Sequence, residues 1–166
     1  MVLDGMTRRL GTRGARPAAD VNFEGGLKDV RATDPGFDPS RFTGYAAMTF
    51  RDTQQAWMAR NLAPLRDRFT PELAAALEAH AARLRERRLA NRVEDVEIVA
   101  RVTDAWQEDG RDYVTAHVTG ATIDYTVDER GQVVEGSKTS PRPVDELWTF
   151  TRPPGLNPWM LSAIQS

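Results

Sequence analysis

Four side chains in the C-terminal half of the sequence are of types that perform acid–base chemistry, namely Asp104, His117, Asp124 and Tyr125. A carboxylate or an imidazole acts as a general base when an apolar cavity shifts its pKa. If even-numbered positions of two neighbouring strands face inward, Asp104 and Asp124 share the face of Val118 and are buried carboxylates, whereas His117 faces away. Equally, both carboxylates could cap strand ends that water reaches.

Other kinds of chemistry have no support in the sequence. The chain of 166 residues has no cysteine and two histidines, so thiolate metal sites, disulfides and multi-histidine metal sites are not expected. We find no Ser-His-Asp arrangement, phosphate loop or metal-ligand spacing. The sequence therefore predicts no catalytic residue, metal or cofactor. The alternative is an enzyme that acts on a small apolar substrate through Asp104 or Asp124.

A run of arginines is the best candidate for a charged binding surface. With Glu86 among them, residues 83–92 carry a net charge of +4. An anionic lipid headgroup or an acidic protein partner fits such a surface. Nucleic acid is not expected, because the chain is acidic overall and no aromatic residues interleave the arginines. The alternative is a solvated helix end that the helix dipole favours. The candidates are Arg83, Arg85, Arg87, Arg88 and Arg92, of which Arg85, Arg88 and Arg92 are spaced to share one helical face.

Large apolar side chains form the second candidate surface. Most of them are expected to fill the core, because a bent sheet needs bulky side chains. Some could line an open apolar groove that accepts an acyl chain or an extended peptide segment. The predicted pocket-lining residues are Trp57, Phe69, Trp106, Val118, Trp148 and Phe150.

Helices are expected ahead of these strands. An N-cap at Asp38 predicts a helix over about 39–60. A short helical turn follows at Pro64, and an N-cap at Thr70 begins a helix that runs to about residue 88, with Asn91 as a plausible end.

The rest of the chain has the patterns of an antiparallel meander. Polarity alternates with period two from Val93, and the turn at 108–111 leads to a second strand over 113–126. Further strands are expected at 147–150 and 159–164, with a short pairing around 133–134. Helices followed by strands predict an α+β fold, with helices on one face of a curved sheet of about four strands.

The register of the first hairpin has two solutions. A two-residue loop at Asp109 and Gly110 would set Val102 opposite His117, and a three-residue loop would set Val102 opposite Val118. We expect the second, because it pairs apolar with apolar side chains.

The N-terminal residues differ from this domain in composition. Residues 1–34 are rich in Arg and Gly without an apolar period, which predicts a flexible tail or linker ahead of a domain over 35–166. Charge is also uneven, at +5 over residues 1–92 and −7 over residues 93–166. No window approaches the roughly 18 apolar residues of a membrane span, and no secretory signal is visible.

Several segments occur in a characteristic order. They are Asp-Pro-Gly-Phe-Asp at 34–38, Asp-Ala-Trp-Gln-Glu, Asp-Tyr-Val-Thr, Ile-Asp-Tyr-Thr-Val-Asp, Val-Val-Glu-Gly, Leu-Trp-Thr-Phe and a terminal Leu-Ser-Ala-Ile-Gln. Over residues 34–166 this ordered set resembles the Tim44-like domain, which is the C-terminal domain of the mitochondrial import-motor membrane anchor and of its bacterial relatives. No single one of the motifs is specific.

The resemblance implies a cone-shaped fold similar to nuclear transport factor two, with helices over a strongly bent sheet. It also implies a scaffold that lies peripherally on the bacterial inner membrane and contacts anionic lipid. A protein partner is expected at the arginine run, and an extended peptide segment is expected in the apolar groove. A homo-oligomer is a further expectation. Bacterial relatives usually carry a hydrophobic segment ahead of this domain, which this sequence lacks. Either the sequence is part of a longer protein or this member is not anchored.

Overall fold

The computed structural model describes residues 9–10 and 23–166. Within them, helices precede the main strands, which confirms the predicted α+β order. The helices are α1 (Phe23–Thr33), α2 (Pro39–Met58), the 3-10 helix η2 (Ala63–Arg68) and α3 (Pro71–Glu86). The strands are β1 (Arg9–Leu10), β2 (Ala90–Glu108), β3 (Arg111–Val127), β4 (Val133–Gly136), β5 (Arg142–Arg152) and β6 (Met160–Gln165).

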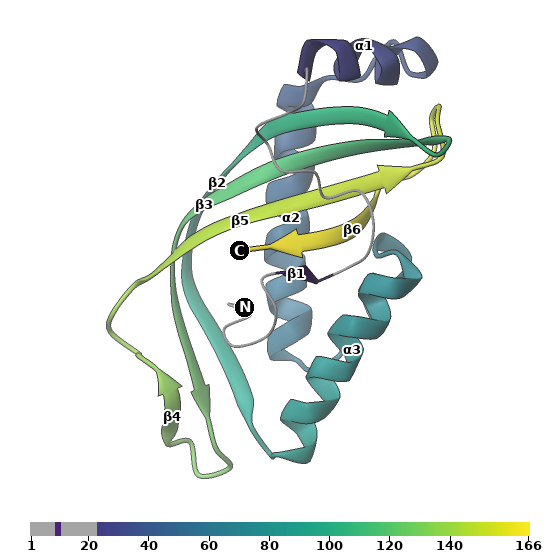
Figure 1. Cartoon of the computed structure of the whole chain (residues 1–166). Helices are drawn as coiled ribbons and strands as arrows, with labels where there is room; N and C mark the ends of the chain where they lie inside the picture. Colours follow the sequence, from purple (N-terminus) through teal and green to yellow (C-terminus); the bar gives the residue numbers. More distant parts are fainter. Residues whose placement is uncertain (1–8, 11–22) are drawn as a thin grey trace.

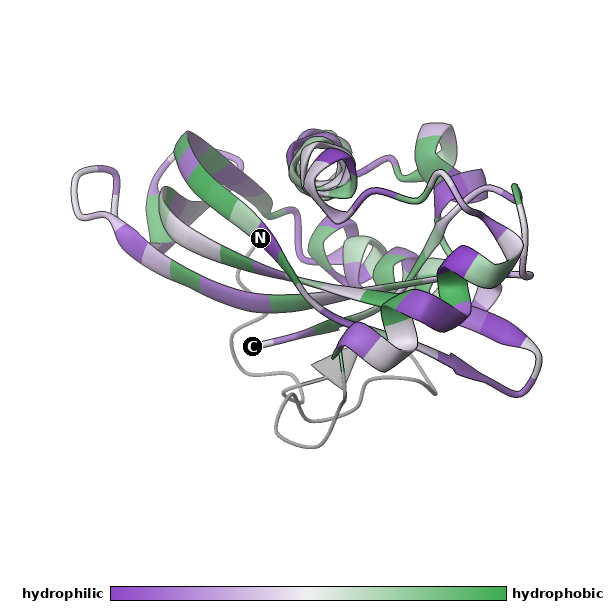
Figure 2. Ribbon diagram, turned by 90° about the horizontal axis from the view of Figure 1, so that it is seen from above, coloured by the Kyte–Doolittle hydropathy of each residue, from purple (hydrophilic) through white to green (hydrophobic). Residues whose placement is uncertain are grey.

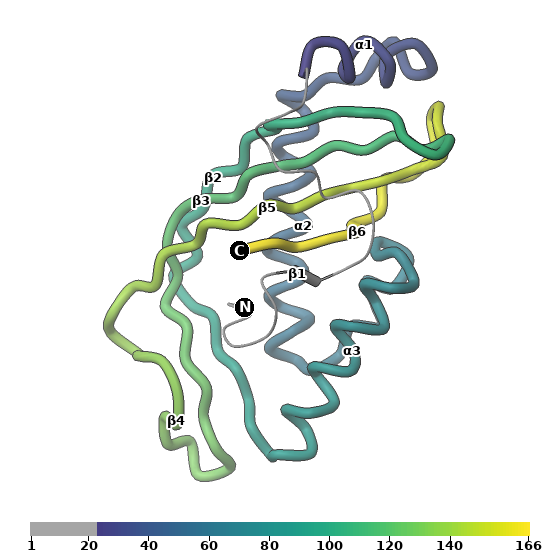
Figure 3. Tube along the Cα trace, in the orientation of Figure 1, coloured from purple at the N-terminus to yellow at the C-terminus, as the bar shows by residue number. Residues whose placement is uncertain are grey.

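The strands form one antiparallel sheet in the order β1-β6-β5-β3-β2, with β4 added beside β3. The predicted strands correspond to β2, β3, β5 and β6, and β4 confirms the short pairing predicted around 133–134. The short β1 pairs with β6. The sheet bends sharply along β2, β3 and β5, and α2 passes behind it (Figures 1 and 3). Seen from above, α2 lies along one face of the sheet (Figure 2).

The concave face of the sheet holds the core. Phe50 of α2 packs on Trp148 of β5 with ring centroids 5.1 Å apart, and Leu73 and Leu77 of α3 are fully buried. Both helices start at the predicted caps. The Asp38 carboxylate accepts a hydrogen bond from Ser40 N at 2.9 Å, so one of the N-terminal donors of α2 finds a partner.

The β2–β3 hairpin corrects the predicted register. Glu108 pairs with Arg111, so the loop has two residues, Asp109 and Gly110. Their φ angles of 50° and 70° are those of a type I′ turn, whose twist suits a hairpin. A bulge between Val102 and Asp104 then shifts the pairing, so that Val102 lies opposite Ala116. Val102 therefore still faces an apolar side chain, as predicted, but the bulge and not a longer loop produces this pairing.

The N-terminal boundary also differs from prediction. The composition of residues 1–34 predicts a tail, but residues 23–33 form α1, whose Leu27 and Val30 are buried in the core. Close packing accounts for the glycine at position 26, because a Cβ there would lie 1.6 Å from the carbonyl oxygen of Ala105. Residues 1–8 and 11–22 of the predicted tail lie outside the described residues.

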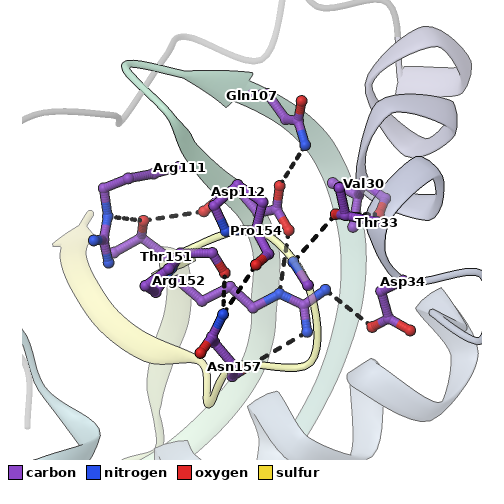
Figure 4. Close-up of polar contacts among 12 residues, drawn as sticks. Val30, Thr33, Asp34, Gln107, Arg111, Asp112, Thr151, Arg152, Pro154 and Asn157 are labelled. Atoms are coloured by element: carbon purple, nitrogen blue, oxygen red, sulfur yellow. Dashed lines mark hydrogen bonds and ion pairs between the residues drawn. The ribbon is translucent and has the colours of Figure 1, made fainter.

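A buried arginine closes one end of the molecule. The Arg152 guanidinium contacts Asp34 at 2.9 Å and Asp112 at 3.2 Å, and it lies 4.2 Å from the centroid of the Trp159 ring. Figure 4 shows how the two ion pairs join the residue after α1 to the start of β3 and the end of β5. We call this group the Arg152 network, with members Asp34, Asp112, Arg152 and Trp159.

Candidate functional site

A groove of about 920 Å³ lies beside α3 in the described part of the chain. Its apolar lining comes from the segment between α2 and α3, from α3 itself and from the start of β6. These residues are Leu62, Ala63, Phe69, Pro71, Ala74, Ala75 and Met160. Polar side chains surround them, namely Arg60, Asn61, Arg66, Asp67, Glu78 and Arg85. We call this feature the α3 groove.

Local structure explains why the groove is open. Leu73, Leu77 and Ala81 turn the apolar stripe of α3 toward the core, so that the small side chains of Ala74 and Ala75 face the groove. Between the lining residues Phe69 and Pro71, Thr70 N donates a hydrogen bond to Leu161 O at 2.9 Å, which ties the start of α3 to β6. The α3 groove therefore combines a fixed apolar floor with a charged margin, as a site for an amphipathic ligand does.

The predicted arginines gather where α3 meets β2, at the lower end of the molecule in Figure 1. They do not share one helical face, because α3 ends at Glu86, Arg88 has a left-handed φ of 54°, and Arg92 lies in β2. We call residues Arg83, Arg85, Arg87, Arg88 and Arg92 the arginine corner, and all five are exposed.

The arginine corner makes its contacts through exposed side chains. Arg88 lies 3.3 Å from Glu129, with both side chains more than 60% exposed, and such pairs contribute little to stability. Arg85 contacts Glu78 at 2.6 Å and donates to the carbonyl oxygen of Arg60 at 2.8 Å. Arg85 therefore belongs both to the corner and to the margin of the α3 groove, so the two features are continuous.

A smaller pocket of about 70 Å³ lies between α2, α3 and the far end of the sheet. Trp57 and His80 line it, with ring centroids 4.9 Å apart. On the strand side, the Asn91 amide donates to the Asp124 carboxylate at 2.7 Å. Burial, with Arg83 nearby, lowers the pKa of His80, which favours a neutral imidazole at pH 7.

The residues predicted to line a pocket fall into separate places. Phe69 lines the α3 groove and Trp57 the smaller pocket. Three others are fully buried in the core and line neither pocket, namely Val118, Trp148 and Phe150.

Trp106 departs from the prediction for a local reason. The bulge between Val102 and Asp104 moves it off the core face, where Ala105 takes its place opposite Val114. Trp106 stacks instead on Tyr113, with ring centroids 5.0 Å apart. Period-two reasoning fails at that point, because one extra residue reverses every side chain beyond it.

The comparison with family models decides the relationship that the sequence suggested. A model described as the Tim44-like domain matches residues 23–166, which is more than half of the chain. The chain belongs to the Tim44-like domain family. The match begins at the first residue of α1, so α1 is part of the domain. The fold is the one this family shares with nuclear transport factor two. A comparison with curated protein sequences gives no match.

The carboxylates proposed for catalysis in this Tim44-like domain lie on opposite faces of the sheet. Asp124 faces the smaller pocket, whereas Asp104 pairs with Thr115 beside Trp106 after the bulge. Both are buried, at 2% exposure for Asp104 and 6% for Asp124, and burial raises the pKa of Asp104. The predicted shared site is therefore not formed.

The other two candidates have separate partners. His117 lies 2.6 Å from Asp145 on the face away from the core. The Tyr125 hydroxyl donates to Glu94 at 2.7 Å, and this hydrogen bond raises the pKa of the phenol.

One buried carboxyl of the Tim44-like domain was not among the residues predicted from the sequence. Glu146 is 4% exposed and accepts a hydrogen bond from the Trp148 indole at 2.8 Å. Burial raises its pKa. The period-two pattern of β5 could have predicted this burial, because Glu146 lies on the same face of the strand as the core residues Val144, Trp148 and Phe150.

Two further features concern the described residues, 9–10 and 23–166. Among them, no helix has the length and apolar character needed to cross a bilayer. The same residues contain no group of three or more His, Cys, Asp or Glu side chains placed to hold a metal ion.

Proposed function

We propose that this chain is a non-enzymatic binding module that associates peripherally with an anionic membrane surface and serves protein transport or envelope-protein handling. The observation that carries the proposal is the continuity of the arginine corner with the apolar α3 groove, through Arg85. Membership of the Tim44-like family supports it. The bacterial inner membrane is the proposed location.

The arginine corner would meet the anionic headgroups. Each basic residue near an anionic membrane contributes about 1 kcal/mol to binding. The five arginines, with Glu86 as the one acidic residue among them, therefore attract the membrane together although each contribution is small. None needs to be buried for this purpose. The attraction is electrostatic and would weaken as salt screens it.

The α3 groove would hold the apolar part of the ligand. A lipid acyl chain or an apolar segment of an extended peptide fits its floor, which includes Leu62, Phe69 and Met160. Burial of an acyl chain contributes about 0.8 kcal/mol per methylene. Arg60 and Arg66 at the margin would bind the anionic end of such a ligand.

Vesicle co-sedimentation tests the role of the arginine corner. We expect binding to vesicles with anionic lipid, weaker binding at high salt, and little binding to neutral vesicles. Replacing Arg85, Arg88 and Arg92 with Ser should abolish most of the binding. A matched control removes three exposed basic residues elsewhere, by replacing Lys28, Arg41 and Arg51 with Ser, and should bind nearly as the original chain does. Equal binding to both kinds of vesicle, or equal losses in the two variants, would refute the proposed role.

A further inference from the structure

The free edge of β2 is the feature of the molecule that remains without a role. β2 stands at the end of the strand order and pairs with β3 on one side. Within the described residues, no strand pairs with its other side. Residues 97–102 form a regular run between two register shifts. A helix covers the strand farther along, where α1 contacts Ala105 through Gly26. Unpaired edges of this kind accept another strand.

The side chains on this run are complementary to themselves. Glu97, Val99 and Arg101 alternate on the exposed side of β2, and Val99 is 68% exposed. Within the described part of the chain, the side chains of Glu97 and Arg101 have no hydrogen bond or ion pair. A valine therefore lies midway between two opposite, unused charges.

We propose that a second copy of this chain pairs antiparallel with the β2 edge, about a two-fold axis through Val99. In this register Glu97 lies opposite Arg101 of the partner subunit, and symmetry forms the same pair twice. Val99 lies opposite its own copy. Antiparallel pairing about a two-fold axis is the usual form of a self-complementary interface, and opposite charges directly across two strands stabilise it.

The backbone supports the same register. The two residues that flank a two-residue hairpin loop form a hydrogen-bonded pair, here Glu108 and Arg111. Backbone N–H and C=O groups alternate in direction along β3, so from Arg111 onward those of the odd-numbered residues point toward β2. Val99 pairs with one of these residues, Thr119, so its own backbone groups point toward β3. The backbone groups of Ile98 and Ala100 then point to the free edge. A two-fold axis at Val99 sets Ile98 opposite the partner's Ala100. The backbone N–H and C=O groups at the free edges of the two copies can then form hydrogen bonds with one another.

Neighbouring registers lack this complementarity. The next ones that keep outward groups facing one another place Val99 opposite Glu97 or Arg101 of the second copy. A charge would then lie against the valine, and the Glu–Arg pairs would be lost. The proposed pairing does not depend on the proposed membrane role.

Sedimentation equilibrium of the full chain over a range of concentrations tests the pairing. The original chain should show a monomer–dimer equilibrium. Glu97→Arg and Arg101→Glu each replace two attractive pairs by two repulsive ones, so each variant should dimerise about tenfold more weakly. The double swap, Glu97→Arg with Arg101→Glu, should restore dimerisation.

An equimolar mixture of the two single variants is the sharpest experiment. The Glu97→Arg chain has two basic residues on this run and the Arg101→Glu chain has two acidic ones, so the mixture should form heterodimers although each variant alone dimerises weakly. Unfolding midpoints equal to that of the original chain show that each variant is folded. A strictly monomeric original chain would overturn the proposal. Dimerisation that neither single swap weakens, or that the mixture does not restore, would overturn it as well.

Discussion

Arg152 and Arg88 carry the same guanidinium group at opposite ends of the molecule. The Arg152 side chain is 4% exposed and contacts two carboxylates. The Arg88 side chain is 73% exposed and contacts one carboxylate at 3.3 Å. A buried charge without partners is costly, whereas an exposed charge is solvated. The closed end of the molecule therefore depends on its arginine for stability, and the open end keeps its arginines available for binding.

The ends differ in packing as well as in charge. At the closed end, α1 lies so close to β2 that a glycine is required at position 26. At the open end, Ala74 and Ala75 leave the α3 groove unfilled. We infer that the closed end sets the shape of the domain and that substitutions at the open end change binding with little effect on folding.

The largest effect is expected from Arg152→Ala, which leaves Asp34 and Asp112 buried without their partner. The free energy of unfolding should fall by about 3–5 kcal/mol. Arg88→Ala is the matched control and should change it by less than about 0.5 kcal/mol. Urea denaturation of both variants measures the difference. Similar losses in the two would remove the contrast between the ends.

A smaller effect is expected from the glycines. Gly26→Ala places a methyl group against the Ala105 carbonyl and should destabilise the domain by about 1–3 kcal/mol. Gly44 lies in α2, and a Cβ added there would meet no atom within 4 Å, so Gly44→Ala should stabilise by up to about 1 kcal/mol. Thermal unfolding measures whether each substitution raises or lowers the stability. A Gly26→Ala variant as stable as the original chain would show that α1 does not pack closely against Ala105.

The stability of the domain should depend on pH through the buried carboxyl of Glu146. Burial raises the pKa of Glu146 above its ordinary value of 4.5, so the folded state holds this proton more tightly than the unfolded state. The stability that the protonated carboxyl provides is therefore present at low pH and falls as pH rises from 4.5 through the folded-state pKa.

Glu146→Gln cannot ionise and should flatten this fall. The variant should match the original chain near pH 4 and exceed it at pH 7, by about 1.4 kcal/mol for each unit by which the pKa is raised. Denaturation between about pH 4 and pH 7 measures it. Glu86→Gln, at an exposed position, is the control, and the hypothesis fails if the two variants have the same pH profile.

The smallest effect on stability is expected in the α3 groove. Ala75 is exposed and lines the groove, so Ala75→Trp should obstruct part of it while changing the free energy of unfolding by less than about 0.5 kcal/mol. Uptake of a fluorescent fatty acid should fall severalfold. Ala79→Trp, on the exposed side of α3 outside the groove, should leave uptake unchanged. Equal uptake in both variants would exclude the groove as the ligand site.

Much of the architecture was predictable because its signals are local. The caps at Asp38 and Thr70 mark α2 and α3, and period-two patterns mark the long strands. Two of the misses depend on the pairing or packing of distant segments, and the third on the place where a helix ends. Gly26 resembles a linker residue until Ala105 is brought against it. The position of Trp106 depends on a bulge that alternation alone does not reveal. The three arginines at 85, 88 and 92 fit one helical face until the chain turns at Arg88.

The sequence by itself determined the class of fold and the charge of the arginine corner, because caps, periodicity and composition act over a few residues. Its ordered segments also carried the resemblance to the family. Tertiary structure decided which of the charged groups are buried. It placed Arg152 between Asp34 and Asp112, turned Glu146 toward the core and left Glu97 and Arg101 in solvent. The physical reason is that the cost of a charge depends on its surroundings, and those surroundings come from segments far apart in the chain.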